Sequence, residues 1–305
     1  MARIKRILIT GANGFIGKNL SEYLENRYQV FKPTHQELDL LDETSVKNYL
    51  TEKKVEIILH CANVGGGRNT VHRKGVFIEN LRMFFNLARN EGIFEKMIFL
   101  GSGAEYDMRH YKPKMQEKYF DTYTPLDDYG FSKYVCAKYI ENSKNIINLR
   151  LFGVFGKYEN PYFKFISNTI VKNILKLPIV INQNVYFDYL FVDDLVKIIE
   201  IFMNKKTKYK TYNVVTGKTI DLLTISKLIN DYSDFKSKIK VLHQGLNHEY
   251  SAKNRRLEEE IGNFRFTPTR NSIKSLYNWY QKNIRGINKK KIIQDQYLKY
   301  IRINK

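Results

Sequence analysis

The sequence predicts an α/β protein built on a doubly wound parallel sheet, with a smaller C-terminal lobe. Short, continuous apolar runs alternate with amphipathic segments through the first half of the chain. A glycine-rich turn separates the first apolar run from the first amphipathic segment. Strands that are buried on both faces read as unbroken apolar runs, and helices separate these runs here. We therefore expect βαβ units and a parallel sheet.

The expected elements follow one another along the chain. Strands are expected at residues 7–9, 28–31, 55–59, 97–100 and 146–152, with helices between them at 15–26, 43–51, 76–90 and 129–142. Further on, we expect a loop at 158–161, a helix at 163–175 and a strand at 178–181. Asp193 and Asp194 are expected to cap a helix at 192–203 that returns to the first domain. The chain then divides into a first domain of residues 1–155 with the return segment 188–205, a lobe of 156–187 and 206–285, and a basic tail of 286–305, which is expected to be either a helix or a loose segment.

Composition excludes several classes of protein. Hydrophobic residues make up 43% of the 305 residues, which is enough to bury a core, so a disordered chain is not expected. Cys61 and Cys136 stand far apart in apolar stretches, which indicates free thiols in a reducing compartment and no disulfide or cysteine metal site. No stretch approaches the roughly 20 apolar residues of a membrane span, and the run at 7–9 is too short for a secretion signal. We therefore expect a cytoplasmic protein with no membrane partner and no metal.

The formal net charge of +20 leaves two interpretations of the surface. It indicates either an anionic partner or a lysine-rich chain with a solvated basic surface. The lysines are spread along the whole sequence, with one local cluster at residues 289–291. Because no recognition motif accompanies the charge, nucleic-acid binding is not expected.

The turn after the first strand has the pattern of a dinucleotide-binding loop. Gly11 lets the chain turn off the strand, Gly14 lets the backbone approach a pyrophosphate, and Gly17 lets the next helix pack on the sheet. The N-terminus of that helix offers free N–H groups to the phosphates. The alternative is an ordinary glycine-rich turn. The residues expected to contact the dinucleotide here are Gly11, Asn13, Gly14, Phe15, Ile16 and Gly17.

The end of the second strand favours NADP(H), with NAD(H) as the alternative. An NAD site usually has a carboxylate there, to bond the ribose 2′-hydroxyl. This strand ends instead in Lys32 and His35, which accept a 2′-phosphate more readily. Asp39, with Leu40 beside it, and Asp42 come later and are expected to flank the adenine. The alternative for Lys32 is a solvated surface lysine.

Three residues form a candidate proton-transfer site. Tyr129 and Lys133 stand four apart and share one face of a helix, where a nearby ammonium lowers the pKa of a phenol. Tyr134 and Lys138 have the same spacing, but Tyr129 is preferred because Pro125 to Asp128 provide a turn and a cap before it. Ser102 follows the strand at 97–100, at the sheet edge where such folds bind ligands.

Together these motifs resemble the extended short-chain dehydrogenase/reductase family, in its branch that modifies nucleotide sugars. The resemblance covers about residues 5–280 on a Rossmann domain. Its parts stand in family order: GANGFIG at 11–17, HCAN at 60–63, EN at 79–80, SGAEY at 102–106, YGFSK at 129–133, LRLFGVFG at 149–156, FDYLFVDD at 187–194 and YNV at 212–214.

The resemblance implies a role for each matching residue. Ser102, Tyr129 and Lys133 would form the catalytic triad, and Ala62, Asn63, Val64, Asn80 and Leu151 would line the ribose and nicotinamide of the cofactor. The substrate, a nucleotide-diphosphate sugar, would meet Arg68, Ser102, Gly103, Tyr129 and Gly153. A homodimer through the helices near 80–90 and 129–142 is also implied, with the smaller lobe binding the substrate.

Departures from the family pattern narrow the expected chemistry. Sugar 4,6-dehydratases carry an Asp-Glu pair where this chain has Gly103 and Ala104, and Glu105 comes one residue too late. GDP-fucose synthase-like members epimerise with a cysteine at the position of Ala104 and a histidine that residues 158–171 do not contain. The nucleotide pocket also departs at Gly153 and Phe187, where 4-epimerases often carry Asn and family members usually carry Arg.

The sequence therefore predicts NAD(P)H-dependent reduction of the C4 ketone of a nucleotide-activated 4-keto-6-deoxy or related sugar, for a surface glycan. One alternative is a 4-epimerase with bound NAD, which uses the same triad. Another is a catalytically silent, NADP-binding regulator or nucleic-acid-binding member of the family.

Overall fold

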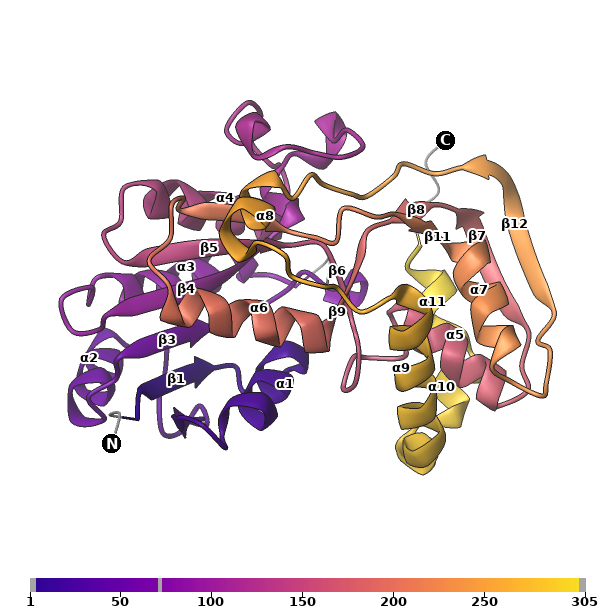
Figure 1. The fold of residues 1–305 in the computed structure, drawn as a ribbon, viewed down its shortest axis with the longest axis horizontal. Helices are drawn as coiled ribbons and strands as arrows, with labels where there is room; N and C mark the ends of the chain where they lie inside the picture. Colours follow the sequence, from indigo (N-terminus) through magenta and orange to yellow (C-terminus); the bar gives the residue numbers. More distant parts are fainter. Residues whose placement is uncertain (1–3, 71–72, 302–305) are drawn as a thin grey trace.

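A computed structural model describes residues 4–70 and 73–301 (Figure 1). Its centre is a sheet of six parallel strands in the order β10-β5-β4-β3-β1-β2. The strands are β1 (Arg6–Thr10), β2 (Gln29–Phe31), β3 (Ile57–His60), β4 (Lys96–Ser102), β5 (Ile146–Leu151) and β10 (Thr211–Val214). The predicted doubly wound α/β fold is confirmed.

The strand order reverses between β1 and β3. From β1 the chain moves outward to β2, and it then crosses back over β1 to form β3. In open parallel sheets such a reversal creates a crevice beyond the carboxyl ends of the strands. Thr10, His60 and Ser102 are the last residues of β1, β3 and β4, so this edge carries the polar side chains of interest.

Helices cover both faces of the sheet. On one face, α1 (Phe15–Leu24) and α6 (Val192–Asn204) bury Leu20, Leu24 and Leu195 in a core with the strands. On the other face lie α2 (Glu43–Glu52), α3 (Val76–Ala88) and α4 (Asp128–Glu141), whose apolar stripes form a second core. Both cores follow from amphipathic segments against strands that are buried on both faces.

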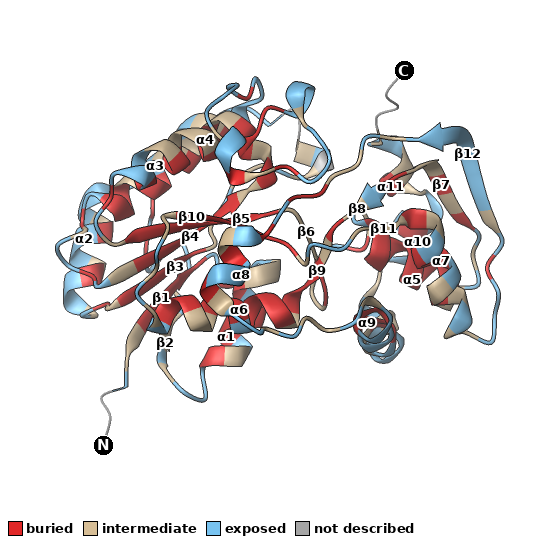
Figure 2. Cartoon of the chain, turned by 45° about the horizontal axis from the view of Figure 1, so that its top comes forward, coloured by how far each residue is buried: buried red, intermediate tan, exposed pale blue. Residues whose placement is uncertain are grey.

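The smaller lobe has a core of its own. It contains α5 (Phe165–Ile174), β7 (Ile179–Asn184), α7 (Leu222–Asp231), β12 (Ile239–Leu246) and α9 (Thr269–Asn283). Short strand pairs, β6 (Gly153–Phe155) with β9 (Tyr189–Phe191) and β8 (Tyr186–Phe187) with β11 (Ile220–Asp221), lie where the lobe meets the sheet domain. Figure 2 shows the buried residues concentrated in the sheet and in α5, whereas most of β12 is exposed.

Two boundaries differ from those expected from the sequence. Strand β10 and helix α8 (Arg255–Ile261), which fall within 206–285, pack on the sheet domain, where Leu257 is buried. The segment expected as a tail forms α10 (Lys289–Ile293) and α11 (Gln296–Lys299), which bury Ile292 and Tyr297 in the lobe core. Isolated apolar residues in a basic segment gave no clear periodic pattern, so this packing was not evident beforehand.

The expected cap of α6 also differs. Asp193 and Asp194 lie in the first turn of the helix, and Phe191 holds the capping position without a side-chain hydrogen bond. The buried Asp194 accepts hydrogen bonds from the Thr267 backbone N–H (2.7 Å) and hydroxyl (2.8 Å). It therefore joins α6 to the segment before α9.

Candidate active site

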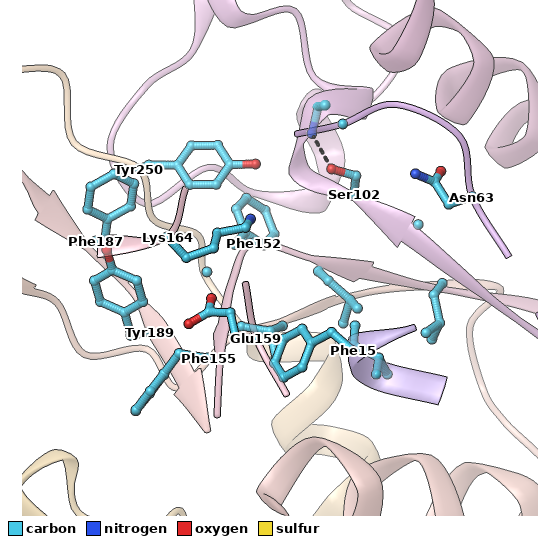
Figure 3. A pocket seen from close by; sticks show the side chains of 18 of the residues that line it. Phe15, Asn63, Ser102, Phe152, Phe155, Glu159, Lys164, Phe187, Tyr189 and Tyr250 are labelled. Carbon is cyan, nitrogen blue, oxygen red and sulfur yellow. Dashed lines mark hydrogen bonds between the residues drawn. The ribbon is translucent and has the colours of Figure 1, made fainter. Parts of the chain in front are cut away.

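A cavity of about 520 Å³ lies at the carboxyl edge of the sheet, between the sheet domain and the lobe (Figure 3). This volume falls within the range of small-molecule sites. The predicted site residues that line it are Phe15, Ile16, Asn63, Ser102, Tyr129, Lys133, Leu151 and Gly153. The structure thus brings together the expected catalytic residues and the start of α1.

The glycine turn has the geometry that a pyrophosphate needs. Gly11 has φ +65°, and a Cβ atom there would lie 2.8 Å from the Ala62 backbone. A Cβ on Gly17 would lie 2.3 Å from the Gly11 carbonyl oxygen, so both positions require glycine. Gly14 and Asn13 are exposed, and α1 begins after Gly14 with no side-chain cap and no acid in its first turn. Its free N–H groups therefore suit a phosphate.

The structure changes the interpretation of the second strand. The ammonium of Lys32 lies 2.5 Å from the carboxylate of Glu25, which comes from the end of α1. A carboxylate from another element therefore pairs with Lys32 beside the end of β2. Asp39 is exposed and accepts from the Leu41 backbone N–H, whereas the side chain of Leu40 is buried. Asp42 caps α2.

Ser102 is held from two sides. Its backbone N–H donates to Glu105 Oε1 (2.9 Å), and its hydroxyl oxygen accepts from the Ala104 backbone N–H (3.1 Å). The Glu105 carboxylate points away from the cavity, because it is fully buried and pairs with Arg150 at 2.7 Å. Neither Gly103 nor Ala104 offers an acid, so the residues that follow Ser102 supply no carboxylate for dehydration.

The pKa of Tyr129 differs from the expectation, and the pKa of Lys133 is shifted as well. Burial raises the pKa of Tyr129 to about 12, and a hydrogen-bonding interaction with Ser102 opposes this rise. Burial lowers the pKa of Lys133 to about 8. The Lys133 ammonium donates to the Leu100 carbonyl (2.8 Å) and lies 5.9 Å from the Tyr129 ring centroid. The expected lowering of the phenol pKa is therefore wrong: burial is the dominant cause of the shift, and Lys133 is not among the groups that lower the pKa.

The competing Tyr134 and Lys138 pair lies on the surface. The Tyr134 hydroxyl and the Lys138 ammonium both bind the carboxylate of Asp121. At Tyr129, in contrast, Asp127 caps α4 by accepting from the Gly130 N–H at 2.8 Å. The cap directs the first turn of α4 toward the cavity, as the sequence predicted.

The loop after β3 lies against Tyr129. Asn80 holds this loop by exchanging two hydrogen bonds, each of 2.9 Å, with the backbone of Val64. A Cβ atom on Gly66 would lie 2.7 Å from the Tyr129 ring. Asn63 lines the cavity, and the Ala62 N–H donates to the Thr10 hydroxyl (3.2 Å). Arg68 begins a short 3₁₀ turn, and its side chain lies outside the described residues.

Several residues that line the cavity were not among the predicted site residues. Tyr250 stands in a segment without a motif, whereas Tyr189 and Phe187 belong to the motif at 187–194 but had no predicted contact with the cavity; all three line it. Glu159 is 5% exposed, and burial raises the pKa of its carboxyl to about 7. Lys164, which directly precedes α5, reaches into the cavity near Glu159 (Figure 3). A sequence gives no sign that such distant residues face one site.

Gly153 and Gly103 stand where any larger side chain would collide with neighbouring residues of the site. A Cβ atom on Gly153 would lie 2.9 Å from the Asp188 carbonyl oxygen, and one on Gly103 would lie 2.6 Å from the Phe152 ring. Burial raises the pKa of Asp188 to about 6, although its carboxylate accepts from the N–H groups of Thr216 and Gly217. The cavity is thus lined by hydroxyl groups, lysine side chains and aromatic rings.

Two other features, a metal site and a membrane-spanning helix, are not found among the described residues. Within residues 4–70 and 73–301, no cluster of three His, Cys, Asp or Glu side chains could hold a metal ion. None of the helices described is both long and apolar enough to cross a bilayer. Cys61 and Cys136 are free thiols.

Comparison with known proteins agrees with this geometry. GDP-6-deoxy-D-talose 4-dehydrogenase of Aggregatibacter actinomycetemcomitans is 27% identical, over 89% of this chain and 97% of its own length. GDP-L-colitose synthase of Yersinia pseudotuberculosis is 24% identical, over 76% and 83% of the two chains. A GDP-mannoheptose C4 reductase from Campylobacter jejuni, solved with NADP bound, superposes with a TM-score of 0.80 at 22% identity, over 92% and 99% of the chains.

A match to the sequence pattern of a protein family identifies the family of this chain. Residues 7–215, which span β1 through β10, match the pattern described as the NAD dependent epimerase/dehydratase family. The match covers more than half of the 305 residues and contains the glycine turn, Ser102, Tyr129 and Lys133. The chain therefore belongs to the NAD dependent epimerase/dehydratase family, whose members are NAD(P)-dependent enzymes that modify nucleotide sugars.

Proposed function

We propose that this enzyme uses NADPH to reduce the C4 ketone of a nucleotide-activated 4-keto sugar. The observation that carries the proposal is the meeting of Ser102, Tyr129 and Lys133 with the glycine turn in one cavity. The names of the relatives, a C4 reductase and a 4-dehydrogenase that act on GDP-sugars, support C4 as the reacting carbon and a GDP-sugar as the substrate class. The NADP in the reductase structure supports NADPH.

The cofactor site is formed by the residues of the glycine turn. Gly11, Asn13, Gly14, Phe15, Ile16 and Gly17 would hold the pyrophosphate, and Ala62, Asn63, Val64, Asn80 and Leu151 would line the ribose and nicotinamide. The nicotinamide supplies the hydride when it is bound.

The proton comes from Tyr129. A phenol with a pKa near 12 is protonated at neutral pH, as a proton donor to a developing alkoxide must be. Ser102 orients the ketone oxygen, and the ammonium of Lys133 stabilises the phenolate that remains. In this role Lys133 exchanges its present partner, the Leu100 carbonyl, for the cofactor ribose and the phenol.

The lobe provides the remaining substrate contacts. Lys164 is the cation in the cavity on the side away from Ser102, so it suits the diphosphate (Figure 3). Gly103 and Gly153 leave space for the sugar, and Arg68 stays a proposed substrate contact.

The proposal is tested with NADPH and freshly generated nucleotide 4-keto sugars. We expect stoichiometric loss of absorbance in the reduced-nicotinamide band. Tyr129→Phe should lower kcat by roughly 100- to 10,000-fold and leave NADPH binding intact, because only the proton donor is removed. Tyr134→Phe is the matched control, since its hydroxyl binds Asp121 on the surface and should not affect turnover.

A 4-epimerase with tightly bound NAD is the second candidate. The carboxylate of Glu25 beside Lys32 favours it, because a carboxylate near this position suits NAD and repels a 2′-phosphate. Interconversion of an unreduced nucleotide sugar with its C4 epimer, without net consumption of NADPH, would establish the epimerase and contradict the reductase.

We also propose a cytoplasmic homodimer, with a role in the biosynthesis of a surface glycan. The exposed apolar side chains of Ile78 on α3 and Tyr139 on α4 support the dimer, since these helices lie side by side. The free thiols of Cys61 and Cys136 support a reducing compartment.

A further inference from the structure

A second phenol faces the catalytic serine. Tyr250 stands between β12 and α8, and Figure 3 shows its hydroxyl directed across the cavity toward Ser102. The backbone of Tyr250 is fixed on both sides, because its N–H donates to the Tyr186 carbonyl (3.0 Å) and its carbonyl accepts from the Asp188 N–H (3.1 Å). The position of this hydroxyl is therefore defined by the fold.

The ring of Tyr250 is held by other aromatic residues. Its centroid lies 5.1 Å from that of Tyr111 and 5.2 Å from that of Phe152. Phe187 contacts it edge-on at 6.1 Å. A phenylalanine at position 250 would keep these contacts, so the hydroxyl can be removed without removing the packing.

Gly103 allows the hydroxyl to come this close to the serine. A Cβ atom on Gly103 would lie 2.3 Å from the Tyr250 hydroxyl oxygen, a distance at which something must move. Burial raises the pKa of Tyr250. The phenol therefore stays protonated and able to donate.

The hydrogen-bonding capacity of Ser102 shows what this donor does. A serine hydroxyl has one proton to donate and two lone pairs that accept. The Ala104 N–H occupies one lone pair at 3.1 Å. We infer that Tyr250 donates to the second lone pair and so leaves the serine O–H free to donate to the ketone oxygen of the substrate.

Tyr250 is thus a positioning residue that acts through Ser102. This inference rests on the proposed role of the serine at the sugar oxygen. Without the Tyr250 hydroxyl, the second lone pair of the serine is free to accept from Tyr129. Tyr129 would then be drawn away from the substrate oxygen that it must protonate.

A double-mutant cycle tests the inference. Tyr250→Phe alone should lower kcat about five- to tenfold with little change in KM, the loss expected from one neutral hydrogen bond. In a Ser102→Ala background the same change should cause no further loss, because the acceptor is already gone. Tyr111→Phe is the matched control: it removes a phenol of the same cluster that donates to the Ser251 carbonyl (2.5 Å), and it should not change kcat.

Three results would overturn the inference. An unchanged kcat in Tyr250→Phe shows that the hydroxyl does nothing. An equal loss with and without Ser102 shows that Tyr250 contacts the substrate itself. A loss of NADPH binding in Tyr250→Phe shows that the change disturbs the structure more widely.

The cycle is measured on whichever nucleotide sugar the wild-type enzyme converts, because Ser102 serves reduction and C4 epimerisation alike. A wild-type enzyme that converts neither class of sugar would contradict the proposed function and the role of Tyr250 together. An active wild-type enzyme with an unaffected Tyr250→Phe variant would contradict only the latter.

Discussion

At the scale of single residues, burial shifts the pKa values of Tyr129 and Lys133 in opposite directions. Burial raises the pKa of the Tyr129 phenol to about 12 and lowers that of the Lys133 ammonium to about 8. Each shift disfavours the charged form of its group. At neutral pH the phenol is therefore neutral and can donate a proton to a ketone. The lysine still carries its charge, but its pKa of about 8 lies close to neutral pH.

The pH dependence of kcat/KM for ketone reduction follows from Lys133. Below about pH 8 the ammonium is present and can stabilise the phenolate, whereas at higher pH it is lost. We expect kcat/KM to fall as the pH rises through about 8, measured from initial rates between pH 6 and 10.

Tyr129 should contribute no second fall in this range, since its phenol ionises only near pH 12. Lys133→Arg should extend the plateau to higher pH, because a guanidinium keeps its charge. A flat wild-type profile up to pH 10 would contradict the assignment.

At the scale of elements, a buried ion pair ties the turn after β4 to β5. Glu105 and Arg150 are both fully buried and pair at 2.7 Å. Arg150 also stacks on the rings of Tyr106 (4.4 Å) and Phe120 (4.8 Å). Because Glu105 also accepts from the Ser102 N–H, the pair helps to set the position of Ser102.

Arg150→Met should destabilise the protein by about 3 to 5 kcal/mol, because it leaves the Glu105 carboxylate buried and uncompensated. Urea unfolding at pH 7 measures the change. Lys138→Met is the control: it breaks an exposed ion pair with Asp121 and should cost at most about 1 kcal/mol. Equal effects of the two substitutions would show that the buried ion pair contributes no more to stability than the exposed one.

The C-terminal helices of the lobe give a second prediction at this scale. Ile292 is 1% exposed within the lobe core, whereas its neighbour Ile293 is 66% exposed. Ile292→Ala should cost about 2 to 5 kcal/mol of unfolding free energy, and Ile293→Ala close to none. Similar values for the two would mean that residues 286–301 behave as a tail.

At the scale of the whole molecule, the active site depends on two units coming together. Ser102, Tyr129 and Lys133 come from the sheet domain, while Glu159, Lys164 and Tyr250 reach the cavity from the segments that lead into and out of the lobe. The cavity opens between the two units. Movement of the lobe would therefore change the substrate contacts and the position of Tyr250 together.

The proposed homodimer is also tested at this scale. Ile78 on α3 is 58% exposed, and Ile78→Arg should convert the dimer to a monomer by burying a charge in the interface. Analytical ultracentrifugation distinguishes the two states. Ile293→Arg, on the lobe, should leave the dimer intact, and a wild-type monomer would contradict the proposal.

The sequence by itself determined most of the sheet domain and predicted Ser102, Tyr129 and Lys133 as the residues of the candidate site. Apolar runs and helical periods are local patterns, and the glycine turn and the YGFSK segment at 129–133 lie within single elements or at their junctions. Such features depend on neighbours along the chain, so they can be read before the fold is known.

Only the tertiary structure decided the rest of the site. Glu25 meets Lys32 because the end of α1 lies beside the end of β2. Tyr250 faces Ser102 across the cavity because the chain returns from the lobe across the carboxyl edge of the sheet. The pKa of Tyr129 is raised, against expectation, because the surrounding fold removes the phenol from water. Contacts between distant segments and the burial that they cause arise only when the whole chain has packed, and no local pattern encodes them.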